Sequence, residues 1–146
     1  MPRNAIAYDE DFFAWTEEQA RLLRSGELAA IDALNLAEEI ESMGRSDRHE
    51  LESRLTVLVA HLLKWQAQPE HRSTSWSGTI REQRRQITRK LRDSPSLRPV
   101  LDQMLAEIYL DAREDAAEET SIPEAEFPSD CPFTLDAVLT RSFLPD

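Results

Sequence analysis

The spacing of large apolar side chains near the middle of the chain constrains the fold most. Five of them recur at intervals of four, three, four and three residues: Leu51, Leu55, Leu58, Leu62 and Trp65. This spacing places all five on one stripe of an α-helix. Ser46 or Asp47 suits the start of this helix, Gly44 suits the end of a preceding one, and Pro69 limits the C-terminal end. We therefore predict a central helix of about twenty residues that other elements must cover.

The rest of the chain supplies those elements as further helices. Apolar stripes and capping residues predict helices that begin near Asp9, near Asp32, at Ser73 or Ser75, and after Ser96. With only three glycines and no alternating apolar runs, a sheet has little support. The predicted fold class is all-α, a helical bundle of about five main helices with a short C-terminal helix over residues 134–143.

Length and composition indicate one domain. A chain of 146 residues with 40% hydrophobic content is long enough for a single core, so we predict one all-α domain over residues 1–146. Within it, residues 118–132 are rich in acidic residues and proline and lack a helical period. We predict that they form a surface segment.

Cysteine content and hydropathy indicate the compartment. The single Cys131 excludes an intramolecular disulfide framework, which fits a reducing cytoplasm. The first residues are charged where a signal peptide would be apolar. The longest strongly apolar run, residues 55–63, is far shorter than the roughly twenty residues that span a bilayer. We therefore expect a cytoplasmic protein with no membrane partner.

Several short motifs in a fixed order give the chain a family resemblance. They are Asp9-Glu10-Asp11-Phe12 with Trp15, Leu36 to Glu41 with Gly44, His61-Leu62-Leu63-Lys64-Trp65, Ser75-Trp76, Ser94-Pro95-Ser96-Leu97, Cys131-Pro132-Phe133-Thr134, and Phe143-Leu144-Pro145. With them the chain resembles the uncharacterised bacterial family known as domain of unknown function twenty-nine. The resemblance covers nearly the whole length and implies an all-α fold. It implies no activity, cofactor or catalytic residue.

Glu39 and His61 are the first candidates for chemistry. Each borders an apolar stripe, on helices that a tight turn at Gly44 would bring together. A carboxylate that orients an imidazole suits general base catalysis or metal binding. The structural alternative is a hydrogen-bonded buried pair that fixes how two helices pack. No Glu-x-x-His or His-Glu-x-x-His motif is present, so we expect no metal site.

Arg84 is the second candidate, because it lies with Gln83 on the predicted inward face of its helix. A buried guanidinium without a partner would cost several kcal/mol, so an inward Arg84 predicts an acidic partner. Glu39 is the best-placed carboxylate. The pair would be structural, or Arg84 would bind an anionic ligand.

The charge distribution is uneven. Residues 72–98 carry eight basic and two acidic side chains, although the whole protein has a formal net charge of -11 and a pI near 4.7. A basic helix of this kind suits a nucleic-acid backbone. Against that, the acidic whole repels nucleic acid, and no aromatic residue lies among the arginines after Trp76. Pairing with acidic helices of the same chain is the alternative.

Three functional hypotheses remain at this point. The first is a helical interaction or regulatory protein, acidic and directed at a basic protein partner. The second is a nucleic-acid-associated protein that uses residues 72–98, and the third is a hydrolase-like enzyme with Glu39, His61 and Arg84. No glycine-rich phosphate loop occurs, and Cys131 lies in an acidic segment that disfavours a reactive thiolate, so we expect no cofactor and no catalytic cysteine.

Overall fold

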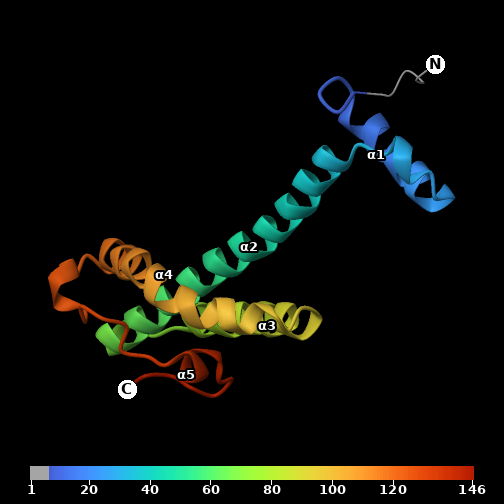
Figure 1. Ribbon diagram of the computed structural model, residues 1–146. Coiled ribbons are helices and arrows are strands. Elements are labelled where there is room, and N and C mark those ends of the chain that lie inside the picture. Colours follow the sequence, from blue (N-terminus) through green and yellow to red (C-terminus); the bar gives the residue numbers. More distant parts are fainter. Residues whose placement is uncertain (1–6) are drawn as a thin grey trace. The chain divides into compact units, whose positions relative to one another are not determined.

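The computed structural model describes residues 7–146, which form helices and contain no strand (Figure 1). The predicted all-α class is confirmed. The long helices are α1 (Phe12–Ser25), α2 (Ala33–Ala67), α3 (Thr74–Asp93) and α4 (Leu97–Thr120), and α5 (Leu135–Leu139) is short. Three single-turn 3-10 helices are η1 (Leu28–Ala30), η2 (Pro69–His71) and η3 (Glu124–Glu126). Among the described residues, no helix is long and apolar enough to cross a membrane.

The predicted break at Gly44 is wrong. Helix α2 runs through it without interruption, and the only glycine with a positive φ among the described residues is Gly26. A glycine inside a helix costs about 1 kcal/mol relative to alanine, which neighbouring side-chain pairs can offset. Arg45 next to it reaches back along the helix to Glu38 at 2.8 Å and to Glu41 at 3.9 Å. The two helices predicted on either side of Gly44 are therefore one.

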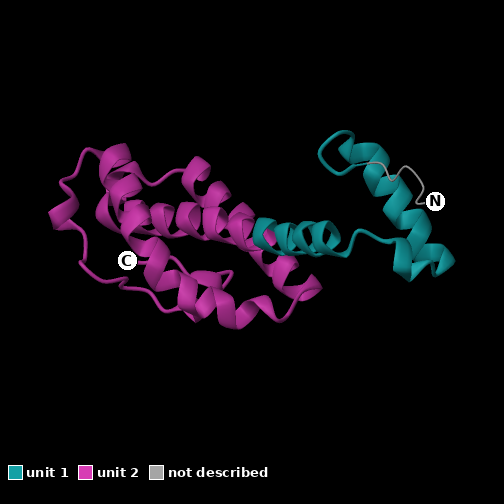
Figure 2. Ribbon diagram, turned by 45° about the horizontal axis from the view of Figure 1, so that its top comes forward, with its two compact units in different colours: residues 1–46 teal, residues 47–146 magenta. Residues whose placement is uncertain are grey.

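The chain divides into two compact units, which Figure 2 shows in two colours: unit 1 is residues 1–46 and unit 2 is residues 47–146. The main hydrophobic core lies in unit 2 and joins α2, α3, α4 and α5. It contains the predicted stripe leucines, which are fully buried, together with Ile80 and Ile87 from α3. A single domain over residues 1–146 stays a prediction.

The C-terminal segment of unit 2 returns along the bundle, and α5 contacts both α3 and α4 (Figure 1). Residues 118–120 of the predicted surface segment continue α4, and Phe127 is buried in the core. The Tyr109 hydroxyl donates a hydrogen bond to the Pro128 carbonyl at 2.6 Å. Most of the segment is exposed, as predicted, but Phe127 and Tyr109 hold it to the core.

Unit 1 is organised around Trp15. Its indole Nε1 donates to Asp32 at 3.1 Å, and the buried Gln19 accepts a hydrogen bond from the Asp32 backbone amide at 2.7 Å. The predicted cap Asp9 is wrong by two residues, because Asp11 accepts the hydrogen bond from the Ala14 amide that begins α1. These contacts fix α1 against the chain that leads into α2.

Candidate functional sites

Arg84 lies in unit 2 and is almost fully buried, with 5% of its surface exposed. Its guanidinium donates to the carbonyls of Val138 at 2.8 Å, Arg141 at 3.3 Å and Phe143 at 2.7 Å. The predicted acidic partner is therefore wrong. Three carbonyls at and beyond the end of α5 accept from the cation, as carbonyls near helix C-termini often do. Burial lowers the pKa of Arg84 from its usual value.

His61 also lies in unit 2, half-buried on α2. Its Nδ1 is 2.8 Å from the Val57 carbonyl one turn earlier, an arrangement in which Nδ1 carries the proton and Nε2 does not. Burial lowers the pKa of His61, and the charge of nearby Lys64 adds to this effect. The neutral imidazole is thus favoured, and its hydrogen bond leads back to its own helix.

Glu39 lies in unit 1, where its carboxylate accepts a hydrogen bond from the hydroxyl of Tyr8. This hydrogen bond is the main cause that raises the pKa of Tyr8 to about 12. The hydrogen bonds of Glu39, His61 and Arg84 thus lead to three different sets of partners. A catalytic role for the three together stays a prediction.

Lys64 is buried on α2 within the His61-to-Trp65 motif. It is not among the site residues predicted from the sequence. Its Nζ lies 2.7 Å from Glu119 on α4 and 4.8 Å from the centre of the Trp76 ring. A buried cation between a carboxylate and an aromatic face is a strong packing contact. The five contiguous residues of the motif gave no signal for the partner on α4.

Unit 1 differs from unit 2 in what it exposes. Of the nine exposed large apolar side chains among residues 7–146, seven lie between residues 12 and 43. They are Phe12, Phe13, Leu23, Leu28, Leu34, Ile40 and Met43. We call these seven the apolar surface of unit 1. Phe13 is 73% exposed, Ile40 and Met43 are each 62% exposed, and Leu34 is 87% exposed.

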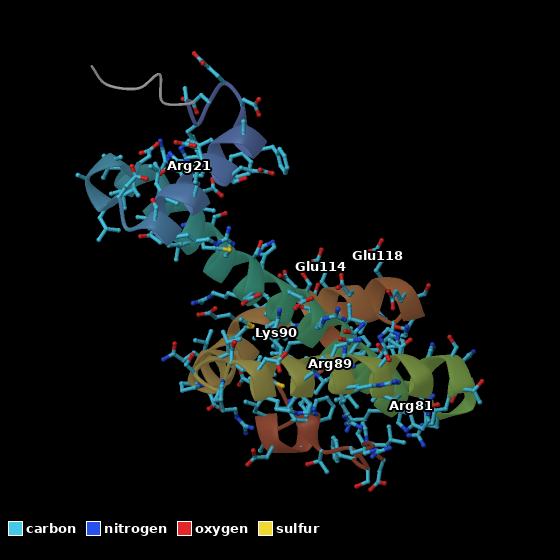
Figure 3. All side chains as sticks on the ribbon, turned by 90° about the vertical axis from the view of Figure 1, so that its right-hand side faces the viewer. Arg21, Arg81, Arg89, Lys90, Glu114 and Glu118 are labelled. Atoms are coloured by element: carbon cyan, nitrogen blue, oxygen red, sulfur yellow. The ribbon has the colours of Figure 1, made fainter. Side chains whose placement is uncertain are left out.

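Leu36, Ile40 and Met43 recur at helical spacing, which predicts an inward stripe, but Ile40 and Met43 are largely uncovered within unit 1. A shallow groove of about 860 Å³ also runs along α1, and its lining residues include Phe13, Glu17, Arg21 and Arg24. Figure 3 labels Arg21. Contiguous exposed apolar groups mark interaction surfaces in folded proteins, and seven exposed large apolar side chains lie within residues 12–43 here.

Acidic groups surround this surface. Residues 7–46 hold ten carboxylates and three arginines. Arg21 pairs with Glu18 at 2.7 Å and Glu27 at 3.4 Å, and Arg45 pairs with Glu38 and Glu41. Both arginines are thus neutralised locally, and a net negative charge remains around the apolar side chains.

The basic segment 72–98 lies in unit 2, and five of its eight basic side chains are bonded to carboxylates or carbonyls of the same unit. Lys90 pairs with Asp47 and Glu50, each at 2.9 Å, and it lies on the α2 side of α3 (Figure 3). The guanidinium of Arg72 donates to the carbonyls of Trp65 and Pro145. Arg85 pairs with Glu82, and Arg98 pairs with Asp136. Among residues 7–146, Arg81, Arg89 and Arg92 have neither a carboxylate within 4.0 Å nor a carbonyl hydrogen bond.

A second charged groove lies between α2 and α4, lined by carboxylates that include Glu52, Asp111, Glu114 and Asp115. Burial and the neighbouring carboxylates raise the pKa of Asp115. Over residues 7–146, no three His, Cys, Asp or Glu side chains are close enough together to hold a metal ion.

Comparison with protein families identifies the family of the chain. The family model described as "Domain of unknown function DUF29" matches residues 7–144, so the chain belongs to the DUF29 family. Neither a curated protein nor a solved structure gives a significant match. The family description assigns no activity, so the function has to be argued from the residues of this chain.

Proposed function

We propose that this member of the DUF29 family is an interaction or regulatory protein that binds a basic partner protein through the apolar surface of unit 1. The observation that carries the proposal is the concentration of exposed large apolar side chains in residues 12–43. Each such side chain gains about 1.5 to 3 kcal/mol when it is fully buried in an interface. Because association itself costs at least about 4 kcal/mol, a partner has to cover several of them to bind with useful affinity.

The charge of unit 1 supports a basic partner. Ten carboxylates against four arginines in residues 1–46 create a negative field around the apolar side chains. Complementary charge at the rim of an interface speeds association and excludes partners of the same sign. A second copy of unit 1 would bring the same negative charge to the same surface, so self-association is disfavoured.

The test uses two variants that remove apolar contacts from this surface, Phe13→Gln and Ile40→Gln. Both side chains are mostly exposed, so neither change should destabilise the fold by more than about 0.5 kcal/mol. Leu110→Gln is the matched control, because Leu110 is 57% exposed but lies in unit 2. Each variant and the wild type are used to capture proteins from cells of the source organism.

The proposal requires a basic protein that the wild type and Leu110→Gln retain and that the two unit 1 variants lose. Binding of that purified partner should also weaken as salt is added, because salt screens the charged rim. If the Phe13→Gln and Ile40→Gln variants capture the same proteins as the wild type, the proposal is contradicted. A dimer in solution that Ile40→Gln converts to a monomer would assign the surface to a second copy instead.

The two alternative functions have less support. A nucleic-acid track along residues 72–98 would need accessible cations, and five of its eight basic side chains are held by carboxylates or carbonyls of the same unit. A hydrolase-like site would need Glu39, His61 and Arg84 to share a substrate, and each has its own hydrogen-bond partner. A cytoplasmic location, which the unpaired Cys131 favours, belongs to the same proposal.

A further inference from the structure

A pocket of about 580 Å³ lies in unit 2 between α3 and the segment that follows α5. Five arginines line it: Arg81, Arg84, Arg85, Arg92 and Arg141. We call it the arginine pocket. Figure 3 shows Arg81 on the side of α3 where the C-terminal segment lies. No carboxylate is among its lining residues.

The α3 side of the arginine pocket follows from helical spacing. Arg81, Arg85, Thr88 and Arg92 are separated by four, three and four residues, so their side chains project from one stripe of the helix. Arg141 comes from the opposite wall, after α5. Positive side chains thus approach the same space from two elements.

Most of these cations lack a negative partner. Arg85 pairs with Glu82 at 2.8 Å, but Arg81, Arg92 and Arg141 have no carboxylate within 4.0 Å among the residues that the structure describes. This is unexpected in a protein with 28 acidic and 17 basic side chains. Like charges held close together repel one another, and an anion placed between them removes that repulsion.

Arg84 holds the two walls together. Through its bonds to the carbonyls of Val138, Arg141 and Phe143, it fixes the segment that carries Arg141 against α3. The backbone that carries Arg141 is therefore held against α3 by a buried residue before any ligand arrives. Such preorganisation lowers the entropic cost of binding.

The ligand class follows from these groups. Guanidinium groups bind phosphate oxygens through paired hydrogen bonds, Thr88 adds a hydroxyl, and the half-buried Leu139 adds an apolar contact. The volume lies within the usual range for small-molecule sites, roughly 300 to 1,000 Å³. We propose that the arginine pocket binds the phosphate group of a small phosphate monoester. This inference does not depend on the partner proposed for unit 1.

A nucleic-acid backbone suits the arginine pocket less well. A polymer needs a continuous positive track, and Lys90, Arg72 and Arg98, which flank the pocket arginines in sequence, are already paired. No aromatic side chain lines the pocket to stack on a base. A compact phosphate-bearing molecule therefore fits these residues better.

The test is calorimetric titration of the full chain at low ionic strength with inorganic phosphate, phenyl phosphate and a single-stranded DNA oligonucleotide. The pocket variants are Arg81→Gln and Arg92→Gln, whose side chains are exposed and unpaired, so the fold should be preserved. Arg89→Gln is the control, because Arg89 is an exposed arginine of the same helix that does not line the pocket.

We expect phenyl phosphate to bind, with inorganic phosphate weaker, and each pocket variant to lose about tenfold in affinity, the usual effect of one charged hydrogen bond. Arg89→Gln should bind as the wild type does. The inference fails if neither phosphate compound binds, or if Arg89→Gln loses as much affinity as the pocket variants. It also fails if the oligonucleotide binds more tightly than phenyl phosphate.

Discussion

Replacement of Arg84 by methionine tests the most unusual contact in unit 2. Methionine keeps much of the length of the side chain but removes the guanidinium that bonds to Val138, Arg141 and Phe143. Two of these bonds are short, at 2.8 and 2.7 Å, and a hydrogen bond to a charged donor contributes about 1.5 to 3 kcal/mol. Summed over these two hydrogen bonds, the contribution to stability is about 3 to 6 kcal/mol.

Burial of the guanidinium opposes this gain. The lowered pKa of Arg84 has burial as its cause, which means that part of the bond energy offsets lost hydration. After removal of the cation, the part-buried carbonyls of Arg141 and Phe143 can be hydrated again, whereas the buried Val138 carbonyl loses its donor. We therefore expect Arg84→Met to reduce the free energy of unfolding by about 2 to 4 kcal/mol, within the range seen when one partner of a buried charged contact is removed.

Urea denaturation gives the unfolding free energy, and hydrogen exchange shows where protection is lost. Hydrogen exchange should accelerate first in residues 135–143. Within residues 7–146, all hydrogen bonds donated by the Arg84 guanidinium lead to this segment. The control Arg89→Met changes an exposed arginine of the same helix and should stay within about 0.5 kcal/mol of wild type. Equal midpoints for Arg84→Met and wild type, with no change in exchange, would refute the proposed role of Arg84 in holding residues 138–143.

Three further predictions concern other elements. Gly44→Ala should stabilise the protein by about 0.4 to 1 kcal/mol in urea denaturation, because Gly44 is helical and a Cβ there meets nothing within 4 Å; destabilisation would contradict a continuous α2. Since the pKa of folded His61 lies below its unfolded value, the unfolded chain protonates first as pH falls, and stability is lost on acidification. His61→Gln should therefore flatten the decline of the urea midpoint between about pH 7.5 and 5.5, and an unchanged slope would contradict this. Glu39→Gln, in a Tyr109→Phe background, should lower the pKa of Tyr8 from about 12 in an absorbance titration. An unchanged pKa would mean that a group other than Glu39 raises it.

The apolar spacing of residues 51–65 predicted the core correctly, since a stripe of leucines can be stable only when it is covered. The caps at Ser73 and Thr134 were predictable for a similar reason, because each side chain satisfies a backbone amide within the next three residues. Interactions of this kind are local in sequence. A helical period or a capping residue contains most of the information needed to place them.

Long-range polar partners were not predictable in this way. A buried Arg84 needs an acceptor, and the predicted acceptor was Glu39, whereas the acceptors are carbonyls more than fifty residues later. Every residue has a backbone carbonyl, so the sequence cannot show which ones will be left over at a helix end. The place of Arg141 in the arginine pocket was not predictable either, because a single arginine after α5 gives no sequence pattern.

The wrong prediction of a helix break at Gly44 matters for the proposed function, because it changes which side chains of residues 36–43 are exposed. A turn there would have folded residues 36–43 back and covered Ile40 and Met43, as their spacing predicts. Because α2 continues instead, both side chains are mostly exposed, and the apolar pattern has no cover within unit 1. An amphipathic helix without cover loses the hydrophobic stabilisation that selects such a pattern. The pattern therefore favours cover from another molecule, and the carboxylates beside it favour one that is positively charged.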